Sequence, residues 1–276
     1  MAYKSIQLLV NVNEYAKPNA VVEFAIEFAR REGAHLSVLE IAQLVDFPIG
    51  RLLPLADAII DQINDERLAT ANSIAGHIEV SARLAGVTAD WSIAQRAPEA
   101  ARKAAIAASR LCDLVIAPKS KGVLSAEESL IEAVLFDSGR PVLIVPPEWE
   151  ASPLLDHVVV AWDGGARAAR AVGDAMPLLE KAGRVEVVCV TPDRSGEALG
   201  AELARHLSRH DVEVSVTDLP LRYADAGRTL MEHLCAMRPS LLVMGAFAHA
   251  RLLQHVVGGT TSLMLTDAKV PVLYSY

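Results

Sequence analysis

The chain carries Cys112-Asp-Leu-Val-Ile-Ala117 followed by Pro141-Val-Leu-Ile-Val-Pro146, and it repeats this pattern as Ser240-Leu-Leu-Val-Met-Gly245 followed by Pro271-Val-Leu-Tyr-Ser275. In both places a segment long enough for one helix separates two short apolar runs. An internal repeat means that each copy is a structural unit that buries its own apolar faces. The chain is therefore predicted to be a tandem duplication.

The beginnings of the two copies also match. Ile6–Asn13 and His157–Asp163 are short runs rich in β-branched residues, and each ends in a polar residue before a helical pattern, so Asn13 and Asp163 are equivalent. The proline-rich stretch 146–153 cannot continue a strand or a helix and is interpreted as a linker. We expect one domain over residues 1–147 and a second over residues 153–276. A chain of this length is expected to form about two domains.

Strand and helix patterns alternate through both copies. In the second copy we expect strands over residues 158–162, 185–190, 212–219, 241–245 and 270–274, and helices over residues 166–180, 196–209, 226–237 and 260–266. Such alternation requires parallel strands, because each helix carries the chain back across the sheet. The predicted fold class is α/β, with two tandem, doubly wound, five-stranded parallel sheets of the Rossmann-like or flavodoxin-like kind.

The first copy differs by a long segment between its second expected strand, residues 35–41, and its third, residues 87–91. The apolar spacing over residues 57–84 predicts a single long amphipathic helix. The preceding loop, Val45–Pro54, carries apolar residues and two prolines. It is either a cover for a cleft or a partner surface, or an ordinary packed loop.

The composition is that of ordinary globular domains, with 52% hydrophobic residues and a formal charge of −8. No run of Lys and Arg neutralises phosphates, so binding to nucleic acid or to an anionic membrane is not expected. The sequence has no apolar stretch of about 18 residues and no signal-peptide pattern, so a cytoplasmic location is expected. Cys112, Cys189 and Cys235 lie in or beside apolar segments, which predicts buried, reduced thiols.

In open parallel sheets, ligands bind beyond the carboxyl ends of the strands, where the strand order reverses. In the second copy this place is formed by Asp163-Gly-Gly165 and by the segment from Gly245 to Gly258-Gly-Thr-Thr261, where a helix is expected to begin. Amides at a helix N-terminus attract anions, and glycines let a phosphate approach them. A nucleotide triphosphate is one candidate ligand. Turn and N-cap chemistry alone is the other explanation of these residues.

On these residues the chain resembles the universal stress protein family, in its tandem form, over essentially its whole length. Nucleotide-binding members of that family carry three spaced glycines followed by Ser or Thr, and the corresponding residues here are Gly245, Ala248, Gly258 and Gly259-Thr260. Ala248 replaces the second glycine, and Gly259 stands where the hydroxyl residue usually falls, although Thr260 and Thr261 follow at once.

The resemblance implies an adenine nucleotide alpha hydrolase-like fold with ATP, accompanied by Mg²⁺, in the second domain. It implies that Asp163 meets the adenine or ribose, that Val190 lines the base pocket, and that the amides from Gly258 to Thr261 hold phosphates. Arg251 is either a phosphate partner or a solvated charge. In the family the last strands of two domains pair antiparallel, which implies an internal pairing of residues 142–145 with 272–274 and is compatible with a further homodimer.

The equivalent loop of the first copy has lost this chemistry. Ser125-Ala-Glu-Glu128 is a capping box, in which the Ser hydroxyl accepts a hydrogen bond from the Glu128 amide and the Glu128 carboxylate reaches back. A carboxylate at the helix start repels phosphate. We therefore expect at most one nucleotide per chain, in the second domain.

Other chemistries lack their residues. His206 and His210 have the i, i+4 spacing of a zinc-binding pair, but no third ligand is near in sequence, and surface histidines are the other interpretation. His249 and His255 flank the loop, either as ligand contacts or as packed or surface residues. The sequence has no P-loop lysine motif, no Gly-x-Ser-x-Gly and no His-Glu-x-x-His. Catalysis beyond slow ATP hydrolysis is not expected.

The predicted function is that of a cytoplasmic stress-response protein that binds adenine nucleotide. The alternative is a non-nucleotide protein-interaction module of the same fold, which would use the Val45–Pro54 loop or the dimer surface. A metal-dependent enzyme that uses the histidines is a third, weaker hypothesis. The path of the backbone at Ala248 discriminates between the first two, because phosphate fits only if the loop leaves the cleft open.

Overall fold

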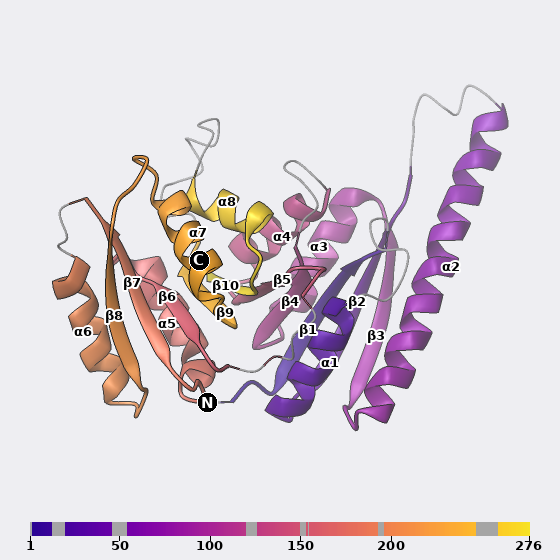
Figure 1. The fold of residues 1–276 in the computed structure, drawn as a ribbon. Coiled ribbons are helices and arrows are strands. Elements are labelled where there is room, and N and C mark those ends of the chain that lie inside the picture. The colour runs from indigo at the N-terminus through magenta and orange to yellow at the C-terminus, as the bar shows by residue number, and fades with distance from the viewer. Residues whose placement is uncertain are drawn as a thin grey trace. The chain divides into compact units, whose positions relative to one another are not determined.

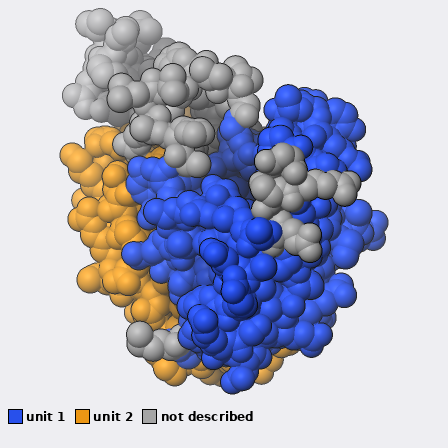
Figure 2. Space-filling model, turned by 90° about the vertical axis from the view of Figure 1, so that its left-hand side faces the viewer, with its two compact units in different colours: residues 1–2, 119–123, 141–276 blue, residues 3–118, 124–140 orange. Residues whose placement is uncertain are grey.

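The computed structural model describes residues 2–12, 20–45, 54–119, 126–149, 153, 155–192, 196–246 and 259–276. The chain divides into two compact units, one made of residues 3–118 and 124–140, the other of residues 1–2, 119–123 and 141–276 (Figure 2). We call them the N-terminal unit and the C-terminal unit.

The described part of the first copy alternates between strands and helices (Figure 1). Its elements are β1 Ser5–Asn11, α1 Ala20–Glu32, β2 His35–Gln43, α2 Pro54–Leu84, β3 Ala89–Arg96, α3 Pro98–Ser109, β4 Leu114–Pro118, α4 Ala126–Asp137 and β5 Val142–Val145. The second copy repeats the order with β6 Val158–Ala161, α5 Ala166–Leu179, β7 Val185–Thr191, α6 Gly196–Ser208, β8 Val214–Pro220, α7 Ala226–Met237, β9 Leu241–Gly245, α8 Thr260–Asp267 and β10 Val272–Ser275.

The strand order confirms the predicted fold class. In the N-terminal unit the order is β3-β2-β1-β4, and β1 pairs parallel with both β2 and β4. In the C-terminal unit the order is β5-β10-β9-β6-β7-β8, in which β6 to β10 are parallel to one another. The order reverses beside β1 and beside β6, which are the points where a doubly wound sheet opens a crevice.

The last strand of the first copy lies in the C-terminal unit. Strand β5 pairs antiparallel with β10, and Leu143 is opposite Leu273. Both strands are fully buried, with Tyr274 among the largest enclosed side chains. Each strand therefore satisfies backbone groups that an uncovered edge would leave unpaired.

The central strands read as continuous apolar runs because helices cover both of their faces. Every residue of β4 is buried, as are the first three residues of β6 and the first four of β9. The outer strand β3 differs, since most of its side chains are exposed or half-buried. Its expected position, residues 87–91, was too early, and the strand runs from Ala89 to Arg96 beside the long helix α2 (Figure 1).

Two of the three cysteine predictions hold. Cys112 and Cys189 are buried, and burial raises the pKa of each thiol to about 11. The prediction for Cys235 is wrong, because this thiol is exposed. The buried neighbours on α7 are Leu230 and Leu234, and the residue after Leu234 is turned about 100° away from them around the helix.

No helix in the described ranges is both long enough and apolar enough to span a bilayer.

Candidate functional site

Asp163 forms the turn that leads from β6 into α5. Its Oδ1 accepts a hydrogen bond of 2.8 Å from the Gly165 amide, and Gly164 has φ +74°, a left-handed conformation that favours glycine. A Cβ atom on Gly164 would lie 2.9 Å from Cδ1 of Leu199, so the start of α6 packs closely over this turn. Asp163 is exposed, and its hydrogen bond goes to Gly165, the N-cap of α5.

Gly245, the last residue of β9, is required for packing. A Cβ atom at this position would lie 2.6 Å from the Arg167 carbonyl carbon and 2.7 Å from the Ala168 amide nitrogen. The end of β9 therefore contacts the first turn of α5, directly after the Asp163 turn. The structure brings Gly245 and Asp163 to one edge of the sheet, and the absence of a side chain at Gly245 follows from this close approach.

Val190 lies half-buried near the end of β7, and the following residue is tied to the next strand. Thr191 Oγ1 donates a hydrogen bond of 2.8 Å to Asp218 Oδ1 on β8. Burial, together with the Asp218 and Asp163 carboxylates, raises the pKa of the Cys189 thiol. Two carboxylates therefore act on the carboxyl ends of β6, β7 and β8, a negative environment that suits a cation or a metal-bearing ligand.

Gly259 is the N-cap of α8, and as a glycine it has no side chain to accept a hydrogen bond from the first amides of this helix. A Cβ atom on Gly259 would meet no atom of the described residues within 4 Å. The neighbouring helix α7 contrasts with it, because its Asp225 N-cap accepts a hydrogen bond of 3.1 Å from the Arg228 amide. The N-cap of α8 thus contributes no side chain of its own, and amides at a helix N-terminus attract anions.

Thr260 and Thr261 begin α8 and are held close to the start of α7. A Cβ atom on Gly227 would lie 3.1 Å from the Thr260 Cα atom. Thr260 is half-buried and Thr261 is buried. The buried Thr261 side chain thus belongs to the packing around the helix start.

The remaining predicted positions lie outside the described residues. These are Ala248, Arg251 and Gly258, the histidines His249 and His255, and in the first copy Asn13, residues 46–53 of the Val45–Pro54 loop and Ser125, together with the side chain of Glu128.

The sequence interpretation did not identify Arg167, which the structure places beside Gly245. Its guanidinium carbon lies 4.3 Å from the centre of the Tyr276 ring, a cation–π contact. A cation in the first turn of a helix is unfavourable for the helix dipole, and this unusual placement of Arg167 is the feature of the sequence that could have drawn attention to it.

Among the residues that the structure describes, no third potential metal ligand joins His206 and His210. Both side chains are exposed on α6 and at its end, and their ring centres are 5.1 Å apart. No group of three potential ligands that could hold a metal ion occurs within the part of the chain that the structure describes. His210 Nδ1 lies 3.5 Å from Glu180 Oε1, an exposed contact typical of a surface histidine.

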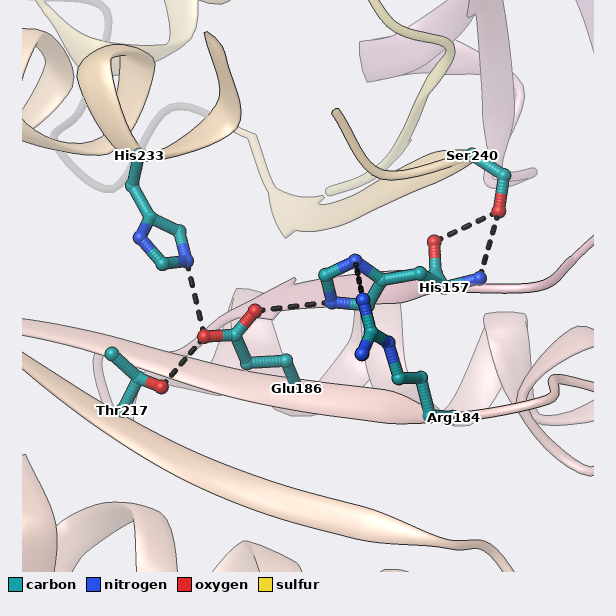
Figure 3. A network of polar contacts seen from close by, with 6 residues as sticks. All are labelled: His157, Arg184, Glu186, Thr217, His233 and Ser240. Atoms are coloured by element: carbon teal, nitrogen blue, oxygen red, sulfur yellow. Dashed lines mark hydrogen bonds and ion pairs between the residues drawn. The ribbon is translucent and has the colours of Figure 1, made fainter. Parts of the chain in front are cut away.

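A buried polar cluster that the sequence interpretation missed lies at the opposite, amino-terminal end of the C-terminal sheet (Figure 3). Glu186 on β7 accepts hydrogen bonds from Thr217 Oγ1 at 2.6 Å, His157 Nε2 at 3.0 Å and His233 Nε2 at 3.1 Å. The His233 and Thr217 hydrogen bonds hold the pKa of the Glu186 carboxyl at about 2, despite burial. The cluster links β6, β7, β8 and α7.

His157 completes this cluster at its edge. Its Nδ1 lies 3.3 Å from a guanidinium nitrogen of Arg184, while Ser240 Oγ exchanges hydrogen bonds with the His157 backbone. Burial and the Arg184 charge lower the pKa of His157 more than Glu186 raises it. These hydrogen bonds join residues of the strands and of α7, so the cluster holds strands and helix together.

Comparisons with known proteins agree on the fold. No protein-family model matches the chain, and no curated protein matches its sequence. A universal stress protein from Archaeoglobus fulgidus DSM 4304 has a similar structure, with a TM-score of 0.75 at 20% identity over 98% of this chain and 97% of that chain.

Two proteins from Pseudomonas aeruginosa are also similar. A putative universal stress protein from strain UCBPP-PA14 has a TM-score of 0.61 at 17% identity over 99% of this chain and 93% of that chain. A functionally unknown protein from strain PAO1 has a TM-score of 0.61 at 15% identity over 99% of this chain and 92% of that chain. The chain therefore has the fold of the universal stress proteins in their tandem, two-domain form.

Proposed function

We propose that the chain is a tandem universal stress protein that binds one adenine nucleotide, as ATP with Mg²⁺, at the carboxyl edge of its C-terminal unit. In this proposal the protein responds to stress in the cytoplasm by changing with nucleotide occupancy, and hydrolysis is slow or absent. The observation that supports it best is the glycine N-cap of α8, where Gly259 supplies no side chain and a Cβ atom would meet no described residue within 4 Å. Phosphate oxygens are suitable acceptors for those amides.

The charged residues of the same edge fit the rest of a nucleotide. Asp163 follows β6 and Asp218 lies on β8, and Mg²⁺ is commonly held by one or two carboxylates together with substrate phosphates. Val190 offers an apolar surface near the end of β7 for the base. Mg²⁺ would neutralise phosphate charge that the carboxylates otherwise repel.

Gly259→Asp tests the proposal. An aspartate N-cap would accept hydrogen bonds from the α8 amides and stabilise the helix, relative to glycine, by about a few tenths of a kcal/mol. The same carboxylate would repel phosphate, so we expect a loss of ATP affinity of at least about 100-fold together with a raised melting temperature. Isothermal titration calorimetry with MgATP and thermal unfolding measure both effects.

Ala97→Asp is the matched control. Ala97 is the N-cap of α3 in the N-terminal unit and also lacks a side-chain capping hydrogen bond. This substitution adds the same charge at a different helix start, so ATP binding should stay at the wild-type level. Unchanged ATP affinity in Gly259→Asp, or no binding to the wild type, would contradict the proposal.

The second candidate is a non-nucleotide interaction module, which a groove between α7 and α8 favours. The groove encloses about 630 Å³ and is lined by Tyr223, Arg228, Met231, Glu232, Cys235, Ala236, Leu263 and Asp267. Tyr223 is 67% exposed beside it, an unusual place for a large aromatic side chain. This candidate predicts that MgATP gives no binding heat with any of the three proteins.

A further inference from the structure

Glu40, on β2 of the N-terminal unit, is a buried carboxyl group. Its relative exposure is 0%, and neither Oε1 nor Oε2 has a hydrogen-bond partner among the residues that the structure describes. The equivalent residue of the second copy is Val187, because Glu40 pairs with Val10 as Val187 pairs with Val160. The first copy thus carries an acid where the second copy carries an aliphatic core residue.

The hydrogen bonds place Glu40 on the sheet face that α2 covers. Gln95 of β3 reaches α2, since its Nε2 donates a hydrogen bond of 3.3 Å to the Asn64 carbonyl. Gln95 pairs with Ala42, and Ile93 pairs with Glu40. Because side chains of a strand alternate between faces, Glu40 and Ala42 share the face of Ile93 and Gln95.

The residues of α2 that meet this face are apolar. Glu40 lies two residues before Ala42 along β2, a distance of about 6.6 Å. On the antiparallel helix this corresponds to about four residues beyond Asn64. The inward side chains from there onward are Ala71, Ile74, Ala75 and Ile78, all buried and none polar.

Within the described ranges, the charged groups around this face are exposed or paired elsewhere. Arg67 of α2 donates a hydrogen bond of 2.5 Å to the Gln43 carbonyl, and Glu23 of α1 pairs with His77 of α2 at the surface. The other charged residues of α2 that the structure describes are exposed: Asp61, Asp65, Glu66, Glu79 and Arg83. On β3, Asp90 pairs with His35 on the opposite face.

Burial without any compensating charge raises the pKa of the Glu40 carboxyl to about 8. An ionised carboxylate that lacks donors in an apolar interior is far more costly than a neutral acid. When α2 leaves the sheet, water solvates Glu40 and its pKa returns to about its ordinary value of 4.5. Opening therefore releases a proton at every pH between these values.

We propose that Glu40 couples the docking of α2 to proton concentration, so that acidification tightens α2 on β2 and β3 and alkaline conditions loosen it. The stabilising effect of the neutral acid is fully present below about pH 4.5 and is lost progressively as the pH rises toward 8. In that window the population with α2 undocked grows about tenfold per pH unit.

Hydrogen exchange measured by mass spectrometry between pH 5 and pH 8 tests this coupling in the full chain. In the wild type the protection factors of α2 amides, corrected for intrinsic exchange rates, should fall about 1000-fold from pH 5 to pH 8. Glu40→Gln cannot ionise at this position and should not show this fall. Peptides from α5 should show the same protection in both proteins. Glu66→Gln, which removes an exposed carboxylate of α2, should behave as the wild type.

Glu40→Val introduces the residue type found at the equivalent position of the second repeat, Val187. It gives the same comparison if Glu40→Gln does not fold. Equal pH dependence of α2 protection in the wild type and in the Glu40 variants would overturn the proposal. A loss of protection in α5 that matches the loss in α2 would also overturn it, because the opening would then be global. A wild-type loss confined to the N-terminal unit and centred on α2 supports it.

Discussion

Glu40 and Glu186 show how hydrogen-bond donors decide the charge of a buried acid. Both side chains are almost completely buried on second strands of their repeats. Glu186 receives three donors and its pKa lies at about 2, whereas Glu40 receives none and its pKa lies at about 8. The two repeats therefore place an ionised and a neutral glutamate in nearly the same architecture.

Glu186→Gln should destabilise the protein by about 3 kcal/mol at pH 7. The lowered pKa of Glu186 means that the folded state stabilises the ionised carboxylate by about this free energy, and the glutamine side chain cannot receive it. Urea denaturation of the wild type and the variant measures the difference. Glu213→Gln, which removes an exposed carboxylate, is the control and should change the free energy of unfolding by less than about 0.5 kcal/mol. A similar loss in both variants would contradict the role given to the cluster.

The same cluster should make the fold sensitive to acid. The pKa of Glu186 is lowered, so the folded state holds fewer protons than the unfolded state between about pH 4.5 and 2, and stability is lost as the pH falls through that range. The lowered pKa of His157 extends the loss to pH values just below its ordinary 6.5. In Glu186→Gln the part of the loss below pH 4.5 should disappear.

At the level of helices and strands, Gly245→Ala and Gly173→Ala form a matched pair around α5. A methyl group at Gly245 would meet backbone atoms of α5 at 2.6 to 2.7 Å, whereas one at Gly173, inside α5, would meet nothing within 4 Å. We expect Gly245→Ala to destabilise by about 1–3 kcal/mol and Gly173→Ala to stabilise by about 0.5–1 kcal/mol. Chemical denaturation distinguishes the two, and destabilisation by both or by neither would contradict the packing described.

The sequence predicted helices and strands well where an element has one buried face or is buried on all sides, because both cases leave a clear pattern of apolar residues. In the second copy every expected strand and helix is present and its ends lie within about two residues of the expected ones, as is normal for such boundaries. Strand β3 was misplaced because its exposed Asp90, Trp91 and Ser92 give no apolar pattern to follow. The exposure of Cys235 could not be found because Leu234 and Ala236 make its surroundings look apolar.

Only part of the candidate site could be predicted from the sequence. The carboxyl-edge rule selected Asp163, Gly245 and the start of α8. The structure puts Gly245, the last residue of β9, against the first turn of α5, which directly follows the Asp163 turn. The rule could not reveal that Gly245 is needed for contact with Arg167, or that Asp218 and Thr191 join the edge, because these depend on distances between elements. The cluster around Glu186 was missed for the same reason, since its members come from four elements.

For the whole molecule, the duplication explains both the fold and the asymmetry between its halves. The strand β5 of the first copy completes the C-terminal sheet by pairing with β10, a connection that local patterns could not predict and that only the family resemblance suggested. The copies have then diverged in their buried acids and in their helix starts. Divergence of this kind is expected when one copy retains a binding role and the other is constrained mainly by packing.

This asymmetry predicts the stoichiometry of ligand binding. The capping box predicted from the sequence at Ser125-Ala-Glu-Glu128 would supply a carboxylate in the first copy, while Gly259 in the second supplies none. Calorimetric titration with MgATP should therefore give one site per chain. In the first copy the Glu128 carboxylate would compete with phosphate for the start of α4, whereas the start of α8 in the second copy has no such competitor at its N-cap. Gly259→Asp should reduce this stoichiometry to zero. Two sites in the wild type, or one site that persists in Gly259→Asp, would place the ligand elsewhere.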